Sequence, residues 1–413
     1  MLGAYQQVLR TPHTLPMIAV GLLGRLPLSM VGLGSLLFVE DYTGSYALGG
    51  AVAATGAVTT SLFGPVIGRA ADAYGQRRVL LPILGVFAVA GAVFLWAVRE
   101  DQSRWIMFGA AGVAGACIPP VSSMLRTRWT YLLRGSPRLP TALAFESVVD
   151  EFTFIVGPVL VTFLSTTGHT TSGVVTAFVL ATAGGLLFAG QRKTEPPPGG
   201  AHVSRGPSAM RIPGLRVLCV VGFAIGGILG DLQVSLVAFS DEVGAYSLSG
   251  VLIASLAVGS MVSGILWGVL SFQTPLHRRL ITVLVGLTLL SVPLVLIGDV
   301  LLMGIAVGVF GFAISPSLIT SFTLVEVLVP KAIVTESFTW VGTAVGLGVA
   351  VGASSSGLLV ESFGANQAFL VATALALTAA LTVARFQRGL WPEARPGWTR
   401  WAQLDPARAD RLT

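Results

Sequence analysis

The stretch 68–78, with the sequence GRAADAYGQRR, separates two long apolar segments and indicates the fold of the chain. It carries one acid, Asp72, among small residues and arginines. A membrane protein needs such a short polar connection on its basic side. Gly68 and Gly75 allow close helix approach and a tight turn, and Asp72 can accept hydrogen bonds from backbone amides or pair with a nearby arginine. The stretch therefore predicts a cytoplasmic turn between the second and third membrane-spanning helices.

The composition excludes a soluble protein. Of 413 residues, 54% are hydrophobic and 11% are charged, and the mean hydropathy is +0.82, so the chain lacks the charge needed to cover a soluble surface of this size. Only helices and closed barrels satisfy their backbone hydrogen bonds in lipid, and the long, unalternating apolar runs indicate helices. Cys117 and Cys219 lie inside such runs, which indicates packing residues and not disulfides or metal ligands.

We predict an all-α membrane protein with twelve transmembrane helices in two pseudo-symmetric six-helix bundles. The N-terminal bundle covers residues 1–190 and the C-terminal bundle residues 214–384. A cytoplasmic linker, residues 191–213, is rich in Pro, Gly and basic residues, and a cytoplasmic tail follows at 385–413. The twelve apolar segments are 15–39, 47–70, 79–98, 105–125, 141–165, 172–190, 215–239, 248–270, 280–297, 300–325, 332–360 and 365–384.

The distribution of basic residues predicts the orientation. With both termini in the cytoplasm, all but three of the 25 lysines and arginines fall inside; Arg99 and Arg104 fall outside, and Arg25 lies within a helix. Membrane topology therefore explains the net charge of +6 better than nucleic-acid binding does. We expect an integral protein of the inner or plasma membrane. The tryptophan-containing tail suits the membrane surface, and a disordered tail is the alternative; its tryptophans are Trp391, Trp398 and Trp401.

The two halves carry an internal repeat. The motif at 46–50 returns at 246–250, and at the same offset Gly68 matches Gly268 and Arg78 matches Arg278. Several such matches in register with the predicted helices indicate two homologous halves.

The chain resembles the major facilitator superfamily over nearly its whole length, in its twelve helices, central break and half-repeat. The turn at 68–78 resembles the superfamily's signature loop between helices 2 and 3 at five residues: Gly68, Asp72, Gly75, Arg77 and Arg78. The resemblance implies that this turn is a latch between the halves, with Asp72 near the cytoplasmic start of helix 11; arginines with a purely topological role are the alternative. The sequence departs from the family at Gln76, where an arginine is usual.

Charged residues inside the membrane indicate function because each costs a few kcal/mol at the centre of a helix, on the order of 3 kcal/mol on insertion scales. Arg25 lies about 15 Å into the first helix, at about 1.5 Å per residue, and needs a partner. The fifth helix offers Glu146, Asp150 and Glu151. We expect Arg25 to pair with Asp150 or Glu151, with substrate or a proton competing for the pair; a static ion pair is the alternative.

Further candidates lie on other helices. Asp231 and Gln233 on the seventh helix are candidates for the central cavity, where Asp231 would titrate or bind a cationic group, and a solvated outer position is the alternative. Glu326 and Glu336, near the cytoplasmic ends of helices 10 and 11, are expected to be gate or interface residues. The glycine-rich stretch 342–357 is predicted to be a helix-packing seam.

Prolines interrupt several segments, and the bends they cause suit alternating access, although such bends also occur in inert membrane helices. These residues are Pro27, Pro119, Pro120, Pro158 and Pro316. Two features of the family's proton antiporters are weakened. Arg126 comes after the predicted fourth segment instead of inside it, and the helix 5 motif is reduced to Gly157-Pro158.

These observations predict a secondary transporter that exports a small, mainly apolar organic compound, driven by the proton gradient and without any bound cofactor or metal. Uptake or facilitated movement of a small anion or sugar is one alternative, and a non-transporting sensor or scaffold is another. No enzyme motif is present, and with only two lysines, Lys193 and Lys331, the chain lacks a phosphate-binding loop for nucleotide hydrolysis. The expected partners are the substrate and the bilayer, and we expect a monomer.

Overall fold

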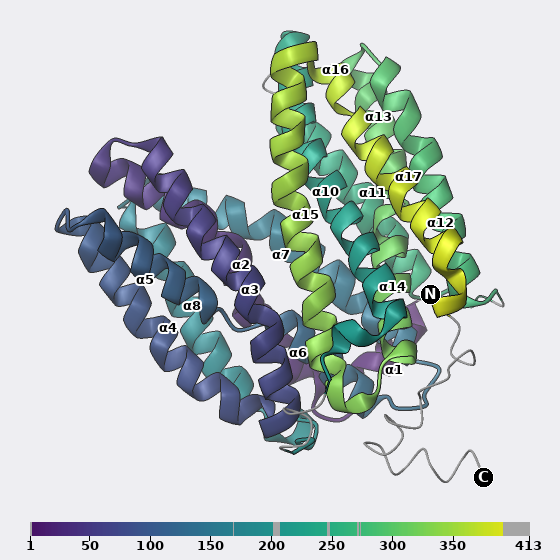
Figure 1. The fold of residues 1–413 in the computed structure, drawn as a ribbon, viewed down its shortest axis with the longest axis horizontal. Helices are drawn as coiled ribbons and strands as arrows, with labels where there is room; N and C mark the ends of the chain where they lie inside the picture. The colour runs from purple at the N-terminus through teal and green to yellow at the C-terminus, as the bar shows by residue number, and fades with distance from the viewer. Residues whose placement is uncertain are drawn as a thin grey trace. The chain divides into compact units, whose positions relative to one another are not determined.

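A computed structural model describes residues 2–167, 169–200, 207–245, 248–270, 272 and 274–390. Within these ranges the chain is helical and contains no strand (Figure 1). The α-helices are α1 (Leu2–Leu9), α2 (Thr14–Thr43), α3 (Tyr46–Tyr74), α4 (Gln76–Arg99), α5 (Arg104–Ala116), α6 (Val121–Leu132), α7 (Leu139–Thr167), α8 (Thr171–Gly190), α10 (Pro213–Glu242), α11 (Ser249–Trp267), α12 (Leu276–Ser291), α13 (Val300–Gly311), α14 (Ile314–Leu328), α15 (Val334–Phe363), α16 (Ala365–Ala368) and α17 (Leu370–Phe386). Short 3-10 helices are η1 (Arg192–Thr194), η2 (Ala209–Arg211), η4 (Val292–Leu296), η5 (Lys331–Ile333) and η6 (Gln387–Leu390).

The described residues contain twelve helical spans long and apolar enough to cross a membrane, which confirms the predicted number. Two spans are interrupted. The fourth consists of α5 and α6, separated by residues 117–120, and the tenth consists of α13 and α14, separated by residues 312–313. The helices of the fourth span continue to Leu132, beyond the end of the predicted apolar segment at residue 125. The tryptophans of the tail, which were predicted to lie at the membrane surface, are outside the described residues.

Large apolar side chains cover the surface of these spans. Trp105 is 85% exposed and Leu296 is 82% exposed, and Leu62, Val66 and Leu289 are each more than half exposed. In water such a surface would drive association, whereas in a bilayer it faces acyl chains of the same polarity. The protein is therefore an integral membrane protein.

The chain divides into two compact units. The N unit contains Gln6–Arg134 and Val149–Gly206, and the C unit contains Met1–Tyr5, Gly135–Val148 and Pro207–Thr413. The chain's two lysines are divided between them, with the exposed Lys193 in η1 of the N unit and the half-buried Lys331 in η5 of the C unit. The domain limits of the sequence analysis stay a prediction.

A glycine seam joins α10 to α15 in the C unit, where the two helices run side by side (Figure 1). A β-carbon built on Gly352 would lie 2.7 Å from the Cα atom of Gly227, and one built on Gly226 would lie 2.7 Å from the carbonyl carbon of Val345. Only glycine allows the backbones this approach. The predicted packing role of the stretch 342–357 agrees with this contact.

The N unit uses the same device between α2 and α8. A β-carbon on Gly184 would lie 2.7 Å from the Cα atom of Gly24. Elsewhere in the N unit, the aromatic rings of Phe38, Phe94 and Phe178 form part of a buried apolar cluster. Close backbone packing and these rings thus hold α2, which carries Arg25, against α4 and α8.

Candidate functional site

A cluster of charged side chains lies inside the N unit, where α2, α6 and α7 each contribute one residue. Asp150 of α7 accepts a hydrogen bond on Oδ1 from Nη1 of Arg25, at 3.0 Å, and one on Oδ2 from Nη2 of Arg126, at 2.6 Å. The hydroxyl of Ser122 donates a further bond to Oδ1, at 2.9 Å. One carboxylate therefore binds two guanidinium groups from two other helices.

The local sequence explains why these side chains meet. Residues 117–120 end α5, and Pro120 precedes the first turn of α6. Ser122 and Arg126 are four residues apart in α6, so both lie on the same face of the helix and reach the same carboxylate. The interruption of the fourth span therefore starts the helix that presents Arg126.

Burial differs within the cluster. The side chains of Arg25 and Arg126 are 2% and 4% exposed, whereas the side chain of Asp150 is 22% exposed. A buried ion pair is costly to form, and removing one partner leaves the other charge buried, at a cost of about 3–5 kcal/mol. Asp150 is therefore the most accessible charged member of the cluster.

The charged residues predicted from the sequence in this region lie on α2, α6 and α7. Arg25 contacts Asp150, one of its two expected partners. Glu151 is half-buried in α7, and Glu146 is fully buried in the first part of that helix. Arg126 was expected beyond the fourth span, but it is buried within it, because the arginine-rich sequence after residue 125 continues as a helix. The four-residue spacing of Ser122 and Arg126, which places both on one helix face, was the sequence feature that could have predicted this contact.

Asp231 and Gln233 of α10 do not share a site. Asp231 is fully buried in the C unit, whereas Gln233 is exposed. The carboxylate of Asp231 accepts hydrogen bonds from the hydroxyls of Ser235, at 2.9 Å, and Ser356, and from the backbone N–H of Ala372, at 3.1 Å. Ala372 is the third residue of α17, so Asp231 supplies an acceptor to the first turn of that helix.

A second carboxylate of α10 has the same role one helix earlier. Glu242 accepts a hydrogen bond from the backbone N–H of Ala365, at 2.8 Å, and Ala365 is the first residue of α16. Asp231 and Glu242 therefore hold the two helical pieces of the twelfth span, α16 and α17. This is a structural reason for a carboxylate inside the membrane, and a transport role for Asp231 stays a prediction.

The stretch 68–78, which we call the signature turn, joins α3 to α4. Gly75 links the two helices with a φ of 95°, a conformation that favours glycine. Gly68 is buried within α3, Asp72 and Arg77 are half-buried, and Arg78 is exposed. The predicted latch concerns both units and stays a prediction.

Gln76, the departure from the family pattern, is buried against Arg128 of α6. Its Oε1 atom accepts from Nε of Arg128, at 2.8 Å, and its Nε2 atom donates to the carbonyl of Met124, at 3.1 Å. Arg128 is fully buried, and its guanidinium lies 3.7 Å from the ring centroid of Phe188. In this chain Arg128 of α6 thus places a buried cation beside the turn, and Gln76 supplies an acceptor for its Nε–H group.

The end of α11, where Gly268 matches Gly68 of the signature turn in the internal repeat, contacts other elements of the C unit. The hydroxyl of Thr141 donates to the carbonyl of Gly268, at 2.7 Å, and the hydroxyl of Tyr5 donates to the carbonyl of Ile265, at 3.0 Å. A β-carbon at Gly268 would collide with the Tyr5 hydroxyl. Burial raises the pKa of Tyr5 to about 12, so the phenol stays protonated and able to donate.

Glu336 binds the end of the linker to α15. Its Oε1 atom accepts from the hydroxyl of Ser208, at 2.9 Å, and from the backbone N–H of Ala209, at 3.0 Å. Glu326 is half-buried near the end of α14. Their predicted role as gate or interface residues stays a prediction.

The predicted prolines fall in two settings. Pro27 and Pro158 lie inside α2 and α7, which continue through them. Pro119 and Pro120 lie in the interruption of the fourth span, and Pro316 follows the interruption of the tenth span, as the third residue of α14. Their contribution to alternating access stays a prediction.

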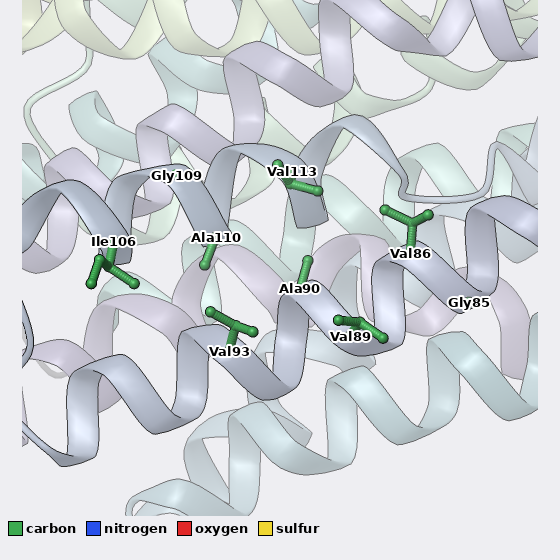
Figure 2. Close-up of a pocket in the computed structure, with 9 residues that line it drawn as sticks. All are labelled: Gly85, Val86, Val89, Ala90, Val93, Ile106, Gly109, Ala110 and Val113. Carbon is green, nitrogen blue, oxygen red and sulfur yellow. The ribbon is translucent and has the colours of Figure 1, made fainter.

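A groove of about 570 Å³ lies between α4 and α5 of the N unit (Figure 2). Val89 and Val93 of α4 extend toward α5, which contributes Ile106, Ala110 and Val113. This lining offers no side-chain donor, acceptor or charge. Among the described residues there is also no group of three or more His, Cys, Asp or Glu side chains placed to hold a metal ion. The charged cluster is therefore the better candidate site.

The sequence matches the family model of the Major Facilitator Superfamily over residues 18–335. The chain belongs to the major facilitator superfamily. Members of this superfamily are transporters and not enzymes, which agrees with the prediction made from the sequence. No curated protein sequence matches this superfamily member.

Solved structures share its fold. The human organic anion transporter MFSD10 (TETRAN) has a TM-score of 0.65 and 17% identity, covering 90% of this chain and 100% of that chain. An outward-facing bacterial homologue of the iron transporter ferroportin has a TM-score of 0.70 and 15% identity, covering 90% and 98%. The E. coli fucose:proton symporter FucP has a TM-score of 0.62 and 15% identity, covering 90% and 98%. At such identities the likeness shows the facilitator fold and not the cargo.

Proposed function

We propose that the protein exports a small, mainly apolar organic compound by alternating access, with protons as the coupling ion. The observation that carries this proposal is Asp150, a partly accessible carboxylate held by two buried arginines, Arg25 and Arg126. Protonation would remove the charge that both guanidinium groups bind, and it would weaken the ties of α7 to α2 and α6 together. One proton would thus act on three helices.

The apolar character of the cargo is inferred from the sequence. The resemblance to the superfamily implies that helices 1, 4, 7 and 10 line the central cavity, and these helices carry many Ala, Val, Leu and Phe residues and few polar groups. Export is proposed on the same ground, since a cargo that partitions into lipid needs active removal. We further propose a monomer in the cell membrane with both termini in the cytoplasm.

A small organic anion is the second candidate cargo. Arg25 and Arg126 converge on one carboxylate, and an acidic group of a cargo would satisfy the same donors in place of Asp150. The structural neighbour from human is an organic anion transporter, which fits this candidate without deciding it. For an anion, the arginines would bind cargo directly.

Flux into proteoliposomes tests these proposals with a panel of apolar amines, neutral compounds and organic acids, each with and without a pH gradient. Proton-coupled export predicts gradient-dependent flux of apolar compounds, which Asp150→Asn abolishes and the exposed-loop control Asp101→Asn retains. Gradient-insensitive flux of organic acids that requires Arg25 and Arg126 would favour the anion candidate. No flux for the whole panel would leave a sensor or scaffold with the same fold.

A further inference from the structure

The first part of the linker, residues 191–200, packs against the signature turn within the N unit; we call it the strap. The end of α3 leaves the carbonyls of its last turn without partners inside the helix. The backbone N–H of Gly199 donates to the carbonyl of Asp72, at 2.8 Å, and that of Gly200 donates to the carbonyl of Ala73, at 2.9 Å. The strap therefore caps the C-terminus of α3.

The strap also caps the N-terminus of α4. Gly75 occupies the N-cap position of α4 and has no side chain with which to accept a hydrogen bond. Glu195 supplies the acceptor instead, because its Oε1 atom receives the backbone N–H of Arg77, at 2.9 Å. A carboxylate at this end of a helix is also favoured by the helix dipole.

The glycine of the turn makes room for this carboxylate. A β-carbon built on Gly75 would lie 3.2 Å from Oε1 of Glu195, and its φ of 95° also favours glycine. Gly75 thus permits both the sharp turn and the approach of the strap.

Arg128 fixes the start of the strap. Its Nη1 atom donates to the carbonyl of Gln191, at 2.9 Å, and to the hydroxyl of Thr194, at 2.8 Å, while its Nε atom donates to Gln76. Thr194 is almost fully buried by this contact. One buried cation therefore joins the strap to the first residue of α4.

We infer that the strap is a working part of the signature turn and that Glu195 is its positioning residue, capping α4 in place of an N-cap side chain. The inference rests on the proposed transport function for its effect on rate, but its structural part is independent of the cargo. A strap that leaves the turn frees the ends of both α3 and α4, so the position of the turn depends on a segment outside the helical bundle.

Hydrogen exchange on the full-length protein in nanodiscs tests the structural part. Glu195→Ala should speed exchange of the amides in the first turn of α4 about fivefold, the scale of a lost helix cap. Glu195→Gln keeps an acceptor oxygen and should restore most of the protection. Gly199→Pro removes the N–H that donates to Asp72, and Gly199→Ala is its control with the N–H retained. Unchanged exchange in both Glu195→Ala and Gly199→Pro would overturn the inference.

Transport measurements separate a working strap from a passive cap. With a compound that the wild type carries, Glu195→Ala should change the maximal rate per folded molecule at least threefold, leave KM unchanged, and recover in Glu195→Gln. Faster exchange with an unaltered rate would show a passive cap and refute the role in transport. If the wild type carries no compound of the panel, the proposed function fails, and the exchange comparison alone decides the strap.

Discussion

Asp150 is shared, and this changes how its interaction with Arg25 must be tested. A simple exchange of charges between two partners assumes that neither has another partner. Asp150 also binds Arg126, at 2.6 Å, so an arginine at position 150 would face a second arginine. The three charges must therefore be exchanged together.

Charge reversal should succeed only when all three charges are reversed. We expect Asp150→Arg to reduce the yield of folded protein, because it places three cations together and costs about 3–5 kcal/mol. Arg25→Glu with Asp150→Arg should recover little, and the triple variant with Arg126→Glu should recover more. Folded yield by size-exclusion chromatography measures this order. Equal recovery by the double and triple variants would contradict the shared carboxylate.

Gln76 shows that a departure from a family pattern can be compensated by another residue. An arginine at this position, as is usual in the family, would remove the acceptor of Arg128 and add a second buried cation. We expect Gln76→Arg to lower the stability of the protein by about 3 kcal/mol. Gln76→Glu keeps an acceptor and should remain within about 1 kcal/mol of the wild type. Thermal unfolding in detergent compares the two, and equal stability would refute this account.

The sequence predicts some of these contacts and not others for a physical reason. Depth along a helix is set by a fixed rise per residue, so Arg25 and Asp150 could be matched from their positions in the chain alone. The contact of Arg126 depends on where α6 begins, and the contact of Asp231 depends on where α17 begins. Interruptions of helices move side chains by several ångströms, and apolar periodicity does not place them.

At the scale of the element, helix ends are the features that need explanation in a membrane. Each end leaves backbone groups unpaired, and the bilayer offers no water to bind them. In this protein α10 supplies Asp231 and Glu242 to the starts of α17 and α16, and the strap supplies both ends at the signature turn. Several of the acids inside or beside the spans thus have a structural partner in the backbone.

The glycine seam between α10 and α15 gives a prediction with an internal control. Gly352→Ala would force its new methyl group against Gly227, and overpacking of this kind costs about 1–3 kcal/mol. Gly357, five residues later in the same helix, has open space, so Gly357→Ala should be neutral or stabilising by up to about 1 kcal/mol. Thermal unfolding of the two variants decides, and a similar loss in both would argue against the seam.

At the scale of the whole molecule, composition and basic residues determine the architecture. Twelve apolar segments follow from bilayer thickness, which depends on length and hydrophobicity and not on side-chain detail. The structural role of the linker was not predicted, because its contacts use backbone amides and one carboxylate in a segment without periodicity. A segment rich in Pro and Gly has the same sequence pattern whether it is a flexible linker or packs against a neighbouring turn.

The orientation can be tested with fusion reporters. With both termini in the cytoplasm, green fluorescent protein fused after residue 413 should fluoresce, and alkaline phosphatase at the same position should be inactive. Phosphatase inserted after Gln102, between α4 and α5, should be active and serves as the opposite control. An active phosphatase at the C-terminus would invert the assignment.

The scarcity of lysine in this chain has a practical use. Each unit contains one lysine, Lys193 at the start of the strap and Lys331 beside α15, and arginine supplies the remaining basic charge. An amine-specific cross-linker can therefore form only one lysine–lysine link within a molecule, and mass spectrometry identifies that link without engineered residues. A series of linkers of increasing length, applied to vesicles with and without a proton gradient, would then measure how the distance between the amines of Lys193 and Lys331 changes during transport.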